Sequence, residues 1–156
     1  MKKVLLFGFE TLPEILTVAG IVQQFGGEAV PVAKEGCGLT LEALAQGKTG
    51  RESGVPIGGK MLVFCGLERE LDGLLAALRQ AGVVCLKAVL TPHNRTWTAV
   101  KLYQELLREH SKGLIALSAC LAGEIPRRLR NGEYDNAKAY ALEMAELFGP
   151  DRFYLE

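Results

Sequence analysis

Histidine is scarce in this sequence, and no two cysteines stand close together. His93 and His110 are the only histidines among 156 residues, and there is no His-x-His pair. The cysteines are too widely spaced for a Cys-x-x-Cys pair: Cys37, Cys65, Cys85 and Cys120. No Ser-His-Asp set or Cys-His pair occurs at a spacing that indicates nucleophilic catalysis. We interpret the cysteines as buried or half-buried thiols of a reducing cytoplasm, and we expect no cofactor.

An excess of charge of either sign is also lacking. The chain has 18 basic and 18 acidic residues, so its formal net charge is zero. A neutral protein has no general attraction to nucleic acid or to anionic lipid, and we expect direct binding to neither. No apolar run approaches the roughly twenty residues that a membrane span needs. The first run, Val4–Phe7, is short and soon followed by Glu10, which favours a first strand over a signal peptide.

The first ninety residues contain a strand–helix–strand pattern. Val4–Phe7 is continuously apolar, which is typical of a strand covered on both faces. Pro13 suits the first turn of a helix that we predict from about Leu12 to Phe25. Ala29–Ala33 is the next predicted strand. Its proline, Pro31, indicates that this strand lies at a sheet edge.

The same pattern recurs further along. Lys60–Phe64 repeats the opening run, KMLVF against KVLLF, and a Gly and a Glu follow in both places. A second helix is predicted from about Glu68 to Ala81, and a further strand from Val83 to Leu90. Between the repeats, Gly47–Gly59 is polar and glycine-rich, and we predict that it is the most mobile internal loop. The sequence therefore predicts an α/β fold of two β-α-β units in a mixed or parallel sheet, with a ferredoxin-like sandwich as the alternative.

A polar loop, Thr91–Trp97, is the most distinctive segment of this half. Thr96 is placed to cap a helix that we predict to run to about Glu109. On one interpretation the loop binds a small anion near this helix N-terminus. The residues of that site would be His93, Asn94, Arg95 and Thr96. On the other interpretation, Pro92 and Asn94 shape a turn, and Trp97 packs into the core.

Three stretches of this half follow a known pattern: VLLFGFE, MLVFCGLE and AVLTPHNRTW, the last followed by an amphipathic helix that ends in LLREH. Through them, residues 1–110 resemble a family of small bacterial α/β proteins to which no activity is assigned, a domain of unknown function. The resemblance implies an α/β fold and no particular chemistry. We predict one domain over residues 1–112.

The rest of the chain, Gly113–Glu156, has a pattern of its own. Leu114–Leu117 is a short apolar run that suits a buried strand. Asn131-Gly132 separates a short helix from a longer one, which we predict over Glu133–Phe148. The apolar stripe of this helix consists of Tyr134, Ala137, Ala141, Met144 and Phe148. Phe153–Leu155 begins another strand, so the segment is predicted to be β-α-α-β.

Residues in this segment match a known pattern in order and spacing: Gly113–Ile115, Ser118–Pro126, Tyr134, Ala137, Phe148-Gly149 and Phe153–Glu156. They resemble one segment of the PHP domain (polymerase and histidinol phosphatase) at the front of the alpha subunit of bacterial DNA polymerase III. In that family the loop cysteine, here Cys120, belongs to a metal-binding cluster, so the resemblance implies a metal ligand at Cys120. The cluster also draws on a His-x-His pair and further histidines, and this chain has no histidine at a matching position. We expect an incomplete PHP segment, with no bound metal and no phosphoesterase activity.

Three functions remain open on this sequence. The one we favour is a cytoplasmic α/β protein without catalytic function that associates with proteins through residues 113–156, as a homodimer or with another partner. The second is a metal-dependent phosphoesterase, or a protein related to the polymerase III alpha subunit, that uses Cys120 with His93 or His110. The third is a binder of small anions that uses the loop Thr91–Trp97.

Residues 113–156 are not expected to fold alone. In a PHP barrel, neighbouring strands and helices cover both faces of this segment, and a piece of roughly 44 residues without disulfides or metal is marginal by itself. We predict that it docks on the N-terminal sheet, with Leu114–Leu117 as an added strand, or that it buries its apolar residues against a second copy of the chain.

Overall fold

The computed structural model describes residues 2–49, 57–110, 116–118, 123–149 and 152–155. They form two compact units, Met1–Tyr103 and Gln104–Glu156. Most of the predicted mobile loop, residues 50–56, lies outside the described residues, as does Cys120. No helix within the described ranges is long and apolar enough to cross a membrane.

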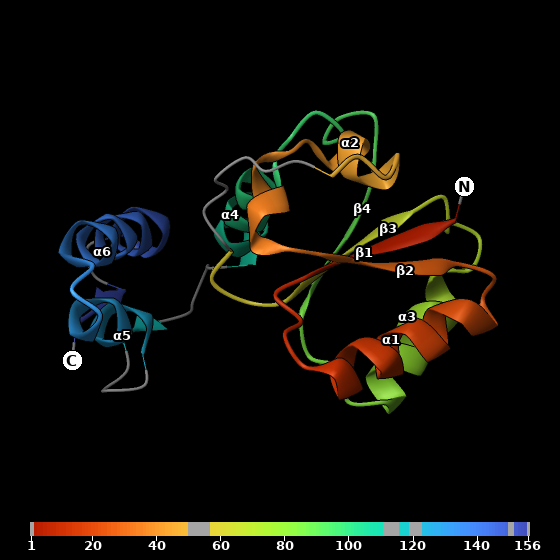
Figure 1. Ribbon diagram of the computed structural model, residues 1–156, viewed down its shortest axis with the longest axis horizontal. Coiled ribbons are helices and arrows are strands. Elements are labelled where there is room, and N and C mark those ends of the chain that lie inside the picture. Colours follow the sequence, from red (N-terminus) through yellow and green to blue (C-terminus); the bar gives the residue numbers. More distant parts are fainter. Residues whose placement is uncertain (1, 50–56, 111–115, 119–122, 150–151, 156) are drawn as a thin grey trace. The chain divides into compact units, whose positions relative to one another are not determined.

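The first unit alternates strands and helices (Figure 1). Its elements are β1 (Lys3–Phe7), α1 (Leu12–Gln24), β2 (Glu28–Val32), the 3-10 helix η1 (Lys34–Gly38), α2 (Leu41–Ala45), β3 (Met61–Cys65), α3 (Leu71–Gln80), β4 (Leu86–Val89) and the first part of α4 (Ala99–His110). Both predicted β-α-β units are therefore present.

The four strands form one mixed sheet in the order β2-β1-β3-β4. Within each β-α-β unit the two strands are parallel, and the units join through the antiparallel pair β1–β3, with Leu5 opposite Val63. The predicted mixed α/β sheet is confirmed, and β2, which contains Pro31, lies at an edge as predicted. The ferredoxin-like alternative is wrong, because each edge strand lies beside the first strand of its own unit. In the split arrangement of a ferredoxin-like fold, another strand separates those two.

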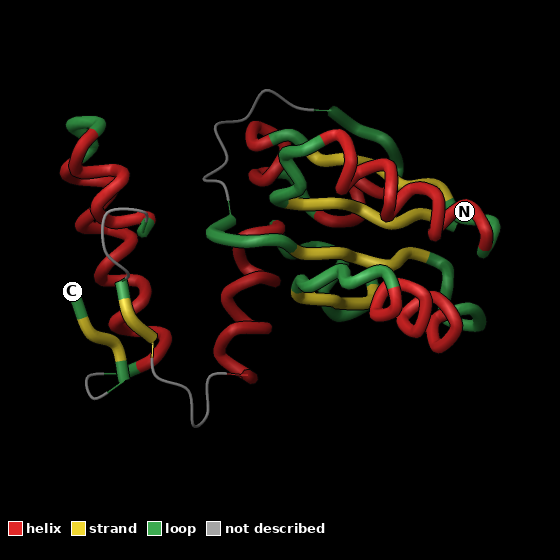
Figure 2. The backbone as a smooth tube through the Cα atoms, turned by 90° about the horizontal axis from the view of Figure 1, so that it is seen from below, coloured by secondary structure: helices red, strands yellow, loops and turns green. Residues whose placement is uncertain are grey.

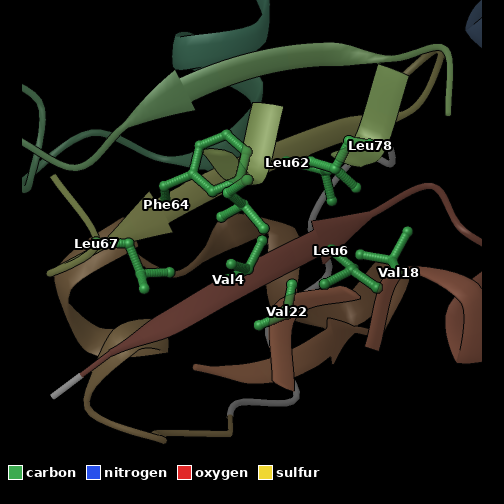
Figure 3. Packing of buried hydrophobic residues seen from close by; sticks show 9 residues of the cluster. Val4, Leu6, Val18, Val22, Leu62, Phe64, Leu67 and Leu78 are labelled. Carbon is green, nitrogen blue, oxygen red and sulfur yellow. The ribbon is translucent and has the colours of Figure 1, made fainter. Parts of the chain in front are cut away.

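Helices cover both faces of the sheet, with α1 and α3 on one side and α2 and α4 on the other (Figures 1 and 2). For this reason every residue of β1 and β3 is buried. On the side of α1 and α3 the core consists of Val4, Leu6, Val18, Val22, Leu62, Phe64, Leu67, Leu74 and Leu78 (Figure 3). Burying each such side chain is worth about 1.5–3 kcal/mol, so this cluster is a main source of stability for the unit.

The two β-α-β units repeat each other in backbone detail. β1 and β3 are each followed by a glycine with positive φ, Gly8 (74°) and Gly66 (67°). α1 and α3 are each followed by another, Gly26 (71°) and Gly82 (70°). The residue after Gly26 and the residue after Gly82 each donate their backbone amide to a carbonyl in the last turn of the preceding helix. This is the Schellman pattern of helix termination. The two β-α-β units are thus related by an approximate twofold axis between β1 and β3.

Two ion pairs obey the same symmetry. Lys2 Nζ lies 2.6 Å from Glu70 Oε1 at the start of α3, and Lys60 pairs with Glu14 in the first turn of α1. Each lysine precedes the central strand of one β-α-β unit and binds a glutamate of the other β-α-β unit. The sequence repeat pairs Lys60 with Lys3, whereas the structure makes Lys2 its counterpart, since the strands and the glycines that follow them set the correspondence.

The second unit contains the last part of α4, then β5 (Ala116–Leu117), α5 (Glu124–Arg130), α6 (Tyr134–Phe148) and β6 (Phe153–Tyr154). The predicted β-α-α-β order is confirmed. β5 pairs with β6 in parallel, Ala116 opposite Phe153. Docking of this run on the N-terminal sheet stays a prediction.

The predicted apolar stripe of α6 is partly correct. Ala137 and Met144 are buried as expected, and Leu147 is buried with them. The prediction is wrong for Tyr134, which is 65% exposed. It occupies the first position of α6, where the helix has no preceding turn of its own to pack beside it.

Candidate functional site

The predicted anion-binding loop is a compact turn held together by the Asn94 side chain. Asn94 is 8% exposed. Its Oδ1 accepts a hydrogen bond from the Thr91 amide (2.8 Å), and its Nδ2 donates one to the Val89 carbonyl (2.9 Å). Both ends of the side-chain amide are thus engaged within the turn. This agrees with the interpretation in which Asn94 shapes a turn.

The backbone of the same turn is bonded to α2. The amides of Leu41 and Glu42 donate to the carbonyls of Trp97 (2.9 Å) and Arg95 (3.0 Å). Arg95 also extends its guanidinium to within 3.8 Å of Glu42 Oε1. Two of the amides in the first turn of α2 therefore find their partners in this loop.

The other residues of the predicted site are exposed, namely His93, Arg95 and Thr96. The His93 ring contacts the half-buried Trp97 edge-on, with 5.0 Å between ring centroids. Helix α4 begins at Ala99, and the Lys101 amide donates to Thr98 Oγ1 (3.3 Å). The prediction that Thr96 caps this helix is therefore wrong by two residues. Anion binding by this loop stays a prediction.

The described cysteines are free thiols, two of them buried and Cys85 half-buried. Burial raises the pKa of Cys37 and Cys85, and it raises the pKa of the Cys65 thiol to about 11. Such thiols are poor nucleophiles at neutral pH. Over the described part of the chain, no three His, Cys, Asp or Glu residues group in a way that could hold a metal ion. The candidate ligand Cys120 is not among those residues.

A cavity of about 250 Å³ in the first unit was not predicted from the sequence. It lies among the N-terminal half of α1, the residue before β3 and the loop after α3. Its lining consists of Phe9, Glu14, Thr17, Val18, Lys60, Ala81, Gly82, Val83 and Val84. Four separate segments supply these residues, and none of the segments carries a recognisable motif. Lys60 pairs with a glutamate that is distant in the sequence, and no sequence pattern indicated this pairing.

Lys60 is the central cation of this cavity. Its ammonium pairs with Glu14 and lies 5.7 Å from the centroid of the Phe9 ring. The hydrogen bond from Lys60 lowers the pKa of the Glu14 carboxyl, and a hydrogen bond from Thr11 acts in the same direction. The Glu14 carboxyl is therefore charged at neutral pH.

The second unit has several large apolar side chains on its surface. We call them the C-terminal apolar set: Leu129, Tyr134, Leu142, Tyr154 and Leu155, each 48–66% exposed. Among the described residues, five of the eight exposed large apolar side chains belong to this smaller unit. Within the described ranges, β5 and β6 pair only with each other.

The arginines of α5 are held by a neighbouring glutamate. Arg127 and Arg128 each approach Glu124 to 2.7 Å. Burial raises the pKa of Glu124, but the hydrogen bonds from the two arginines outweigh it, and the pKa is lowered. This arrangement is an ion-pair network within one helix.

Comparison with known families finds one match in the first unit and the start of the second. Residues 60–112 match the family described as "Domain of unknown function (DUF3783)". The matched range contains β3, α3, β4 and α4. The second half of the chain's repeat and the turn around Asn94 thus lie within the matched range.

Curated relatives are DNA polymerase III alpha subunits. The chain is 46% identical over 56 residues to that of Thermus aquaticus, 44% over 52 residues to that of Treponema pallidum, and 48% over 66 residues to that of Helicobacter pylori (strain J99). These matches cover 33–36% of this chain and 4–5% of the polymerase subunits. No solved structure matches the chain. The chain therefore combines a region of unknown function with similarity to a small part of a replicative polymerase.

Proposed function

We propose that this protein is a non-catalytic association module of the cytoplasm, and that its C-terminal unit binds a second copy of the same chain. Free thiols at Cys37, Cys65 and Cys85 support a reducing compartment. The similarity to a polymerase covers only 4–5% of that enzyme, so it does not bring the polymerase activity to this chain.

The observation that carries the proposal is the C-terminal apolar set. Exposed large apolar side chains gathered on a small unit are typical of interaction surfaces. The corresponding segment of a PHP domain is one slice of a barrel in which other strands and helices surround it. The C-terminal unit resembles that slice, and its exposed apolar side chains are groups that a partner can bury.

A second copy is the partner that fits strand β6 best. A two-stranded parallel sheet is marginal by itself, and its edges are places where a further strand can add. Phe153, Tyr154 and Leu155 are uncharged, so two copies of β6 can approach each other without like-charge repulsion. Antiparallel pairing across a twofold axis would complete a four-stranded sheet and bury Tyr154 and Leu155 of both chains.

The test is the molar mass of the purified full-length protein by light scattering, for the wild type and two variants. Leu155→Glu places a charge in the proposed interface. Val84→Glu is the matched control, since Val84 is 87% exposed in the first unit. We expect a wild-type dimer, a monomeric Leu155→Glu variant and a dimeric Val84→Glu variant. A monomeric wild type at every concentration, or a Leu155→Glu variant that stays dimeric, would contradict the proposal.

A further inference from the structure

The two halves of the first unit differ at the end of each helix. The residue that follows α1 is Phe25, and the corresponding residue after α3 is Ala81. Phe25 packs against the core cluster. Its ring lies so close to α3 that a Cβ added to Gly73 would meet Phe25 Cε1 at 2.9 Å. One half of the repeat thus fills the space between the two helices with its own aromatic ring.

The other half leaves the corresponding space open. Ala81 has no side chain beyond its Cβ, and the 250 Å³ cavity lies where the ring of a phenylalanine would fit by symmetry. Thr17 corresponds to Gly73, so the wall of this cavity carries a methyl and a hydroxyl group. That hydroxyl donates to the Pro13 carbonyl (2.8 Å). The cavity is therefore the unfilled counterpart of a site that Phe25 occupies.

The size and lining of the cavity suit an aromatic group. Protein interiors are close-packed, and an apolar cavity of about 150 Å³ is enough to bind benzene. Phe9, Val18, Ala81 and Val83 supply apolar surface. Small-molecule sites typically combine such surface with a few convergent polar groups, and here Lys60, Glu14 and Thr17 are those groups.

Cations outnumber carboxylates around the cavity when its neighbour is counted with it. A neighbouring cavity of about 300 Å³ shares Gly82, Val83 and Val84 with it and is also lined by Arg79 and Lys87. The two linings together carry three cations and one carboxylate, Glu14. The carboxylate lies in the first turn of α1, where the helix dipole also favours negative charge.

We propose that this cavity binds a small aromatic carboxylate. The aromatic ring occupies the space that corresponds to the Phe25 ring, and the carboxylate binds the Lys60 ammonium. The site is lined by residues of the first unit and uses no residue of the C-terminal apolar set, so it does not depend on the proposed self-association.

The probe is 3-phenylpropionate, titrated into the ¹⁵N-labelled full-length protein. We expect saturable shifts of the amide signals of Lys60, Gly82, Val83 and Val84. The neutral 3-phenylpropanol carries the same ring and tests the ring site alone. Lys60→Met should weaken 3-phenylpropionate binding about tenfold or more, because it removes a charge-assisted hydrogen bond, and should leave 3-phenylpropanol binding unchanged.

A second variant fills the site. Thr17→Gly with Ala81→Phe copies the residues of the occupied half into the open half, and it should abolish the shifts while the rest of the spectrum stays folded. Ala81→Leu is a smaller substitution that should weaken binding if the double variant does not fold. The proposal would be overturned if the wild type showed no saturable shifts, or if the filling variants left the shifts unchanged. It would also be overturned if the acid and the alcohol bound equally and Lys60→Met had no effect.

Discussion

Asn94 illustrates how one buried amide can fix a loop that looks like a binding site in the sequence. The letters Pro-His-Asn-Arg-Thr before a helix suit an anion, yet Asn94 directs its side chain to Thr91 and Val89. Since the sequence gives residue types and not their partners, it left both interpretations open. The structure shows that Asn94 holds the turn.

Asn94→Ala should lower the free energy of unfolding by about 1–3 kcal/mol, because it leaves the Val89 carbonyl and the Thr91 amide without their partner. Thr96→Ala is the control in the same turn, since Thr96 is exposed, and it should change stability by less than about 0.5 kcal/mol. Urea denaturation followed by circular dichroism measures both. Equal stability of the two variants would mean that Asn94 does not organise the turn.

The ion pair of Lys60 with Glu14 should make stability depend on pH. The pKa of Glu14 is lowered in the folded protein, chiefly by its hydrogen bond from Lys60. The stabilisation is therefore present above the pKa that Glu14 has in the unfolded chain, and it is lost as pH falls through the lower folded value. In a Lys60→Met variant, carboxyl NMR titration should show the Glu14 pKa moving up towards its usual value. In Lys101→Met, which removes a lysine over the Trp97 ring, the Glu14 pKa should stay low.

Cys120 is the residue on which the alternative of a metal-dependent phosphoesterase depends. One thiol without further ligands does not hold a divalent ion, so we expect purified protein to contain well under one zinc or manganese per chain. Elemental analysis of the wild type and of Cys120→Ser measures this. About one metal per chain in the wild type that is lost in Cys120→Ser would reverse our conclusion.

Strands β1 and β3 depend on close backbone contact at their ends. Gly8 has φ 74°, and a Cβ there would overlap the carbonyl oxygen of Gly59, just before β3. Neither the conformation nor the space suits a side chain. The junction between the two β-α-β units therefore requires glycine at this point.

Gly8→Ala should destabilise the first unit by about 1 kcal/mol or more, because it adds strain at a positive φ and a clash with the backbone. Gly20→Ala is the matched control in α1, since a Cβ there would meet no described atom within 4 Å. It should stabilise the helix by about 0.5–1 kcal/mol. Thermal unfolding of the two variants should shift in opposite directions, and a shift in the same direction would show that Gly8 is not constrained.

The two units differ in how much core each can build. The first has a four-stranded sheet covered on both faces, whereas the second has two short strands and a surface rich in apolar side chains. A core of the first kind is sufficient for independent folding, and one of the second kind is marginal.

Separate expression tests this difference. We expect Met1–Lys112 to unfold cooperatively in urea and Gly113–Glu156 to be disordered or aggregated on its own. Mixing the two fragments tests whether the second gains structure from the first. Cooperative unfolding of an isolated, monomeric C-terminal fragment would show that it needs neither the first unit nor a second copy.

Local patterns of the sequence determined most of the elements. The apolar runs Val4–Phe7 and Met61–Phe64, the glycines after each helix and the proline of β2 predicted two β-α-β units and an edge strand. Asn131-Gly132 separated the two helices of the second unit. Such features are local, since periodicity, turn chemistry and ring constraints act within a few residues of each other.

Tertiary structure decided what depends on residues far apart in the chain. The pairing of β2 with β1 and of β4 with β3 rules out the ferredoxin-like order. β5 pairs in parallel with β6, and the first residue of α6, Tyr134, is exposed. The Lys60 cavity exists because four segments converge and because Ala81 stands where its counterpart is Phe25. Strand order and cavities follow from which surfaces can be buried together, and no local pattern contains that information.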